Sequence, residues 1–111
     1  QSYNEVLAEA RAQAALGWSA SISHEPVTDE VGRLRVDVAD ATASPLYAAD
    51  VRAVLKRPTN AYLDFETWLV PAGAGTYLAE IDWPADGIWD VLITVEQGAD
   101  RFQVEERLLV R

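Results

Sequence analysis

The chain contains neither cysteine nor methionine, and it has a single histidine among its 111 residues. Without cysteine it forms no disulfide and offers no thiolate for metal binding or nucleophilic attack. Without sulfur of either kind it has no soft ligand for monovalent copper. The first residue is glutamine rather than methionine, so we expect the chain to begin downstream of another segment.

Positive charge is also scarce. Nine basic residues face 18 acidic ones, which gives a net charge of −9. A chain of this charge is repelled by nucleic acid and by an anionic membrane surface. No apolar run approaches the roughly 20 residues that a membrane-spanning helix needs. The length is that of one domain, and half of the residues are apolar, which is enough for a core.

The first residues differ in pattern from the rest. Ser2 and Glu5 have the spacing of a capping box, an alanine-rich run follows, and Gly17 is a natural stop. We therefore predict a helix over residues 2–16, within an N-terminal segment 1–17. Its apolar stripe is mostly alanine, so the helix either packs thinly on the sheet or projects as a juxtamembrane stalk. We favour the stalk.

Residues 87–95 form the segment on which the rest depends. Trp89, Val91, Ile93 and Val95 alternate with more polar residues, which predicts a strand with one buried face and Trp89 in the core.

Six further alternating runs, separated by turn residues, predict the remaining strands. They lie at 18–23, 33–38, 51–55, 63–69, 77–83 and 102–110. Seven short strands with turns between them indicate a mainly β domain over residues 18–111, an immunoglobulin-like antiparallel β-sandwich. Glu106 falls on the inner side of the last strand, so we expect a β-bulge or an exposed end near Glu105 and Glu106.

His24 is the one candidate metal ligand. It lies beside Glu25 and near Asp29 and Glu30 in sequence. Tight transition-metal sites need several converging ligands, so a solvated loop histidine is the better interpretation. We predict no metal site and no cofactor.

Three carboxylates, Asp82, Asp86 and Asp90, flank Trp83 and Trp89. Paired carboxylates beside aromatic rings are typical of glycoside hydrolases. The alternative, which we favour, is that they occupy turns and outer strand faces. No serine has a plausible base, because the lone histidine has no fixed context. The sequence therefore predicts no catalytic residue.

Candidate interaction residues fall on the outer faces of the predicted strands. Tyr62, Trp68, Leu78 and Leu92 would form a docking patch or a sugar platform if exposed. Alternatively the N-terminal helix or a loop covers them. Arg57, within Lys56-Arg57-Pro58, marks the one compact basic spot, which is either a contact point or a solvated strand end.

Several short motifs, in order, resemble the FixH family. They are Tyr3-Asn4-Glu5 with Ala15-Leu16-Gly17-Trp18, Pro45-Leu46 with Ala49 and Val51, Arg57-Pro58-Thr59 with Asp64, Gly75-Thr76-Tyr77, Gly87-Ile88-Trp89-Asp90-Val91, and Asp100-Arg101-Phe102. The resemblance covers nearly the whole chain.

The resemblance implies a periplasmic β-sandwich anchored in the inner membrane by one N-terminal helix, which these residues do not include. It implies a non-enzymatic role in assembling a cbb-type cytochrome c oxidase, with oxidase subunits and a copper-transporting ATPase as partners. Related proteins accompany nitrogen fixation at low oxygen. Two alternatives stay open: a periplasmic copper-handling module, and a carbohydrate-binding sandwich that uses Tyr62 and Trp68.

The resemblance offers no catalytic residues. Its best marked positions here are Gly87, Trp89 and Asp90, which we interpret as turn, core residue and loop-fixing acceptor. The family's usual glycine before Pro45-Leu46 is replaced by Ala43 or Ser44, so we expect that turn to be longer or differently bent.

Overall fold

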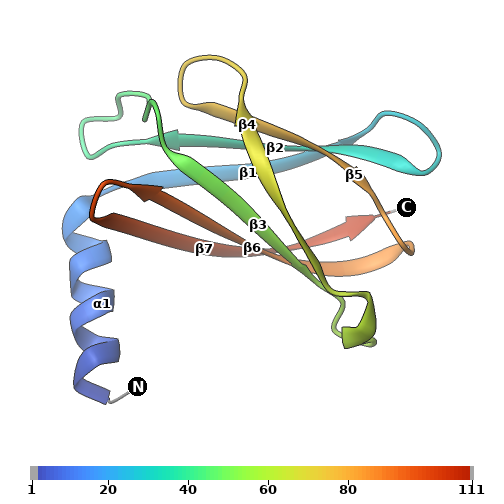
Figure 1. The fold of residues 1–111 in the computed structure, drawn as a ribbon, viewed down its shortest axis with the longest axis horizontal. Coiled ribbons are helices and arrows are strands. Elements are labelled where there is room, and N and C mark those ends of the chain that lie inside the picture. The colour runs from blue at the N-terminus through green and yellow to red at the C-terminus, as the bar shows by residue number, and fades with distance from the viewer. Residues whose placement is uncertain (1–2, 111) are drawn as a thin grey trace.

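A computed structural model describes residues 3–110 as one helix followed by seven strands (Figure 1). The elements are α1 (Tyr3–Leu16), β1 (Ser19–Pro26), β2 (Val31–Ala39), β3 (Asp50–Lys56), the 3₁₀ turn η1 (Ala61–Leu63), β4 (Phe65–Pro71), β5 (Thr76–Asp82), β6 (Gly87–Gln97) and β7 (Asp100–Val110). All seven predicted strands are present, with ends shifted by a few residues.

The strands follow the order β1-β2-β5-β4-β3-β6-β7, and every neighbouring pair is antiparallel. Grouped as β1-β2-β5-β4 and β3-β6-β7, this is the strand order of the seven-stranded immunoglobulin sandwich. Strand β4 pairs with β3 along most of its length and with β5 at its end. It therefore joins the two layers into one nearly closed sheet. The predicted immunoglobulin-like sandwich is confirmed.

The core forms where the inward residues of the two layers meet. On β6 the alternating residues Trp89, Val91, Ile93 and Val95 are all fully buried. Leu34 and Val36 of β2 are buried to the same degree. The period of two thus places one side of each strand in the core, and the prediction that Trp89 is a core residue is confirmed.

The connection from β2 to β3 is held by the buried side chain of Tyr77. Its hydroxyl donates to the Leu46 carbonyl oxygen at 2.7 Å and accepts from the Ala49 amide at 3.2 Å. Before this point Ala43 takes a positive φ of 64°. An L-residue adopts that conformation at a cost of roughly 1–2 kcal/mol that glycine avoids. Ala43 thus adopts a conformation that favours glycine, and the longer or differently bent turn stays a prediction.

Strand β7 contains no bulge. Its register with β6 runs without interruption from Gly87 opposite Val110 to Gln97 opposite Asp100. The predicted bulge near Glu105 and Glu106 is wrong, and the strand does not end there, although both side chains are exposed. Because β7 is an edge strand, Glu106 can turn to solvent without breaking the ladder.

Helix α1 touches the sandwich through few contacts. None of its described residues is buried, and it packs against β7. The Gln13 amide nitrogen donates to the Gln103 carbonyl oxygen at 2.8 Å, and the Gln103 backbone amide donates to Gln13 Oε1 at 2.9 Å. Gln13 thus hydrogen-bonds the backbone N–H and C=O of Gln103, on the edge of β7 that faces away from β6. The N-terminal half of α1 extends past the sheet (Figure 1).

The helix ends as the sequence predicts. Gly17 adopts a φ of +65° and donates its amide to the Ala14 carbonyl, which is the usual glycine-ended terminus. The predicted cap Ser2 lies outside the described residues. Within residues 3–110, no helix combines the length and the apolar character that crossing a membrane requires.

The first prediction concerns the core. Trp89→Ala should lower the free energy of unfolding by about 3–5 kcal/mol, because it removes a fully buried aromatic side chain. The matched control is Trp68→Ala, since Trp68 is 60% exposed. Its cost should stay below about 1 kcal/mol, the usual range for surface changes. Urea unfolding of both variants measures the difference. Equal costs would contradict the assignment of Trp89 as the central core residue.

The second prediction concerns the helix. Backbone amides of α1 should exchange with solvent much faster than those of β6, because no described residue of α1 is buried. Hydrogen exchange followed by mass spectrometry or NMR gives both rates. Gln13→Ala should further speed exchange at Gln103, whose amide loses its acceptor. Equal protection of the two elements would overturn the interpretation of α1 as a loosely attached stalk.

Candidate functional site

A hollow opens where strands β4 and β5 separate. The two strands pair only at Val70 with Leu78 and at Pro71 with Tyr77. The rest of β4 pairs with β3 and the rest of β5 with β2, so among residues 3–110 the facing strand edges have no strand partner there. The hollow measures about 520 Å³ and is lined by Arg33, Thr67, Trp68, Val70, Leu78, Ala79 and Glu80.

The apolar part of this hollow is exposed. Trp68 and Val70 are 60% and 62% exposed and, two residues apart, share one face of β4. Leu78 lies directly opposite Val70 on β5. Helix α1 packs on β7, not on β4, so it does not cover this patch. We call Trp68, Val70 and Leu78 the Trp68 face.

Arg52 of β3 holds Trp68 in place. The two residues are opposite each other in the β3–β4 register, and the guanidinium carbon lies 5.9 Å from the centre of the indole ring. This is a cation–π contact, supported by an ion pair of 3.9 Å from Arg52 to Glu66. The Nε of Arg52 is buried and has no hydrogen-bond partner within residues 3–110. The contact orients a large apolar side chain toward solvent.

Tyr62 does not join this face. It lies on the 3₁₀ turn η1 rather than on a strand, and it is 99% exposed. The Asn60 side chain accepts from the Tyr62 amide at 3.1 Å and so caps the turn. The shallow hollow around Tyr62 is lined by residues 59–62 and does not include Trp68. The two aromatic residues therefore do not form one sugar platform.

Leu92 lies apart from Trp68 as well. It is half-buried on the outer face of β6, opposite Val54 and Glu105 in the two neighbouring strands. Of the four outer-face residues that the sequence singles out, the structure brings together Trp68 and Leu78.

Arg57 is engaged inside the domain. Its guanidinium lies 5.3 Å from the centre of the Trp89 ring and donates to the Ile88 carbonyl oxygen at 3.3 Å. A Cβ on Gly87 would lie 2.9 Å from Arg57 Nη2, and Gly87 has a φ of +113°. Gly87 is therefore needed for both the turn and the arginine. The geometry favours a structural role for Arg57 over contact with a partner.

Asp90 bridges two strands. It accepts from Arg107 of β7 at 2.8 Å, directly across the β6–β7 register. That hydrogen bond and ion pair lower the pKa of the Asp90 carboxyl below its usual value, although burial opposes the shift. Asp90 thus fixes β7 to β6, and its interpretation as a loop-fixing acceptor is wrong.

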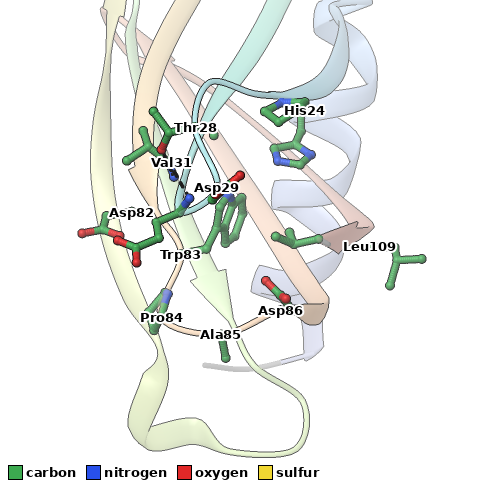
Figure 2. A pocket seen from close by; sticks show the side chains of 14 residues that line it. His24, Thr28, Asp29, Val31, Asp82, Trp83, Pro84, Ala85, Asp86 and Leu109 are labelled. Carbon is green, nitrogen blue, oxygen red and sulfur yellow. Dashed lines mark hydrogen bonds between the residues drawn. The ribbon is translucent and has the colours of Figure 1, made fainter.

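A second hollow, of about 690 Å³, lies at the end of the sandwich where β7 finishes (Figure 2). His24 lines it, half-buried, with its ring edge-to-face against Trp83 at 5.5 Å between centres. Asp29, Glu30, Asp82 and Asp86 line it as well. Among residues 3–110, no group of three or more such side chains is arranged to hold a metal ion. We call this the acidic hollow.

The carboxylates that suggested glycoside hydrolysis are divided between two places. Asp82 and Asp86 line the acidic hollow beside Trp83, whereas Asp90 pairs with Arg107. A general acid needs a raised pKa, and Arg107 moves that of Asp90 in the opposite direction. Trp89 is fully buried and cannot contact a substrate. The three carboxylates do not form one site.

Sequence reasoning missed Val70 and Arg52. Val70 could have been found, because it shares the outward parity of Trp68 two residues earlier. Arg52 could not, because its place beside Trp68 depends on the register between β3 and β4.

Comparison with protein-family models matches residues 1–109 to FixH. Comparison with curated proteins finds no match. The family match spans the helix and the seven strands except Val110, the last residue of β7.

The third prediction concerns metal. The chain has no sulfur ligand and one histidine, so we expect no copper or zinc site of submicromolar affinity. Calorimetric titration of the untagged chain with each metal measures this directly. A stoichiometric site that disappears in His24→Ala would show that the acidic hollow holds a metal ion.

Proposed function

The chain belongs to the FixH family, and we propose from that membership that it is a non-enzymatic accessory factor in the assembly of a cbb-type cytochrome c oxidase. In this proposal it works by protein–protein contact. The partners are oxidase subunits or a copper-transporting ATPase beside them. The domain sits in the periplasm, and a membrane helix before Gln1 anchors it to the inner membrane.

The observation that carries the contact mechanism is the Trp68 face. An exposed tryptophan, held by a cation–π contact, has little rotational freedom to lose when a partner covers it. Val70 and Leu78 extend the apolar surface across two strands. Tryptophan at the centre of such a patch is the side chain most often responsible for affinity in protein interfaces.

The geometry of the hollow adds a second means of recognition. The facing edges of β4 and β5 have main-chain groups without a strand partner among the described residues. A segment of a partner entering the opening could hydrogen-bond to these edges while its apolar side chain contacts Trp68. The Trp68 face and the strand edges therefore favour binding of a protein over binding of a small molecule.

The fourth prediction tests this function in cells that express the full-length protein. Trp68→Glu should lower the amount of assembled oxidase, because a charge on the Trp68 face would be buried without a partner. Loss of a central tryptophan contact corresponds to roughly tenfold or greater weakening of partner binding. Oxidase content is measured from membrane haem spectra and oxygen consumption.

The matched control is Tyr47→Glu. Tyr47 is 62% exposed, close to the 60% of Trp68, and its substitution adds the same charge away from the Trp68 face. Protein abundance and thermal unfolding establish that both variants are folded. Normal oxidase levels in a folded Trp68→Glu variant would exclude the Trp68 face as the docking surface.

A further inference from the structure

The acidic hollow has a chemistry that the Trp68 face lacks. Its lining contains four carboxylates and, among the described residues, no lysine or arginine. The carboxylates come from the β1–β2 turn, from the last residue of β5 and from the segment between β5 and β6, and Figure 2 labels three of them, Asp29, Asp82 and Asp86. Two loops distant in sequence thus converge on one negatively charged opening.

These carboxylates lack internal partners. Within residues 3–110, none of Asp29, Glu30, Asp82 and Asp86 forms an ion pair. The basic residues that do form ion pairs join other carboxylates; they are Arg33, Arg35, Arg52, Lys56 and Arg107. Within residues 3–110, the negative charge at this end of the sandwich therefore has no ion-pair partner and would attract a cation.

A second observation is independent of charge. Trp83 lines the hollow and is only 9% exposed, yet its buried Nε1–H has no acceptor among the described residues. Trp83 Nε1 and His24 Nε2 both lie close to Gly32. A Cβ added to Gly32 would be 2.7 Å from the first nitrogen and 2.8 Å from the second. All three residues line the hollow. A buried donor without an acceptor is costly, so a ligand that supplies one gains affinity.

The margin of the hollow is apolar. Leu109 lies there, and it faces Ile88 directly across the β6–β7 register. Both side chains are exposed. They offer a contact for an aliphatic side chain next to the carboxylates.

We propose that the acidic hollow binds a basic, extended segment of a partner protein. A lysine or arginine of that segment pairs with Asp82 and Asp86, and an aliphatic neighbour packs on Leu109. One of its main-chain carbonyls accepts from Trp83 Nε1–H after the His24 ring, which packs edge-to-face against Trp83, changes rotamer. A metal ion would not use the indole donor, and a neutral sugar would donate hydrogen bonds to the carboxylates but form no ion pair with them. This surface is separate from the Trp68 face, and the proposal does not depend on the role in oxidase assembly.

The fifth prediction uses the 111-residue chain and a capped Lys-Leu-Lys-Leu-Lys peptide as the probe. The peptide should bind, and its affinity should fall as the salt concentration is raised. Binding should also shift the indole N–H resonance of Trp83 in NMR spectra. The matched peptide with glutamate in place of lysine should not bind. Asp82→Asn combined with Asp86→Asn should weaken binding by about three- to tenfold, as expected for two partly exposed ion pairs.

The control separates a local site from the general field of an acidic protein. The control variant combines Asp50→Asn with Glu96→Gln. It also removes two negative charges, from residues that lie opposite each other on β3 and β6, outside the acidic hollow. All four positions are exposed, so both double variants should fold. Full affinity in this control, with loss in the Asp82/Asp86 variant, supports the proposal. Equal weakening in the two, or a Trp83 resonance that does not shift, would overturn it.

Discussion

The fold depends on one aromatic cluster that joins the two layers of the sandwich. The Trp89 ring of β6 lies 5.5 Å from the Trp83 ring, which follows β5, and 5.7 Å from the Phe65 ring of β4. The three residues thus come from both layers and from the strand that connects them. Such tilted and edge-to-face ring contacts add specific geometry to a large buried area. Arg57 closes the cluster over Trp89, and the Trp89 Nε1–H donates to the Ala85 carbonyl oxygen at 3.0 Å.

The strands and their inward faces could be predicted because a period of two needs only local sequence. Trp89 through Val95 illustrates this, since every second residue is buried. The prediction of a bulge near Glu106 is wrong because it rests only on the alternation of inward and outward residues. That alternation assumes that neighbouring strands cover the inward face of every residue. At an edge strand one neighbour is missing, so a charged residue reaches solvent without a change of register.

The candidate site was less predictable, because it depends on which strands are neighbours. The sequence gives Trp68 its outward direction, but it does not say that β4 leaves β5 after two pairs and so opens the hollow. It likewise shows Arg57 as an exposed basic residue, since the ring beneath it comes from a strand about thirty residues away. Strand parity groups Tyr62 with Trp68, although Tyr62 lies on η1, which ends before β4 begins. Long-range register, not residue type, decides each of these cases.

The positions of the two candidate surfaces follow from the course of β7. Near its start, Gln103 holds α1, and at its end Leu109 and Val110 line the acidic hollow. At about 3.3 Å per residue, those positions are roughly 20 Å apart along the strand. If α1 leads toward a membrane, as we propose, the acidic hollow lies roughly 20 Å along β7 from the helix attachment, while the Trp68 face lies on another strand pair. The hollow beside the Trp68 face and the acidic hollow adjoin on β2 and β5, because Arg33 and Glu80 line the first and Gly32 and Asp82 line the second. The two contacts that we propose would therefore lie next to each other on one domain.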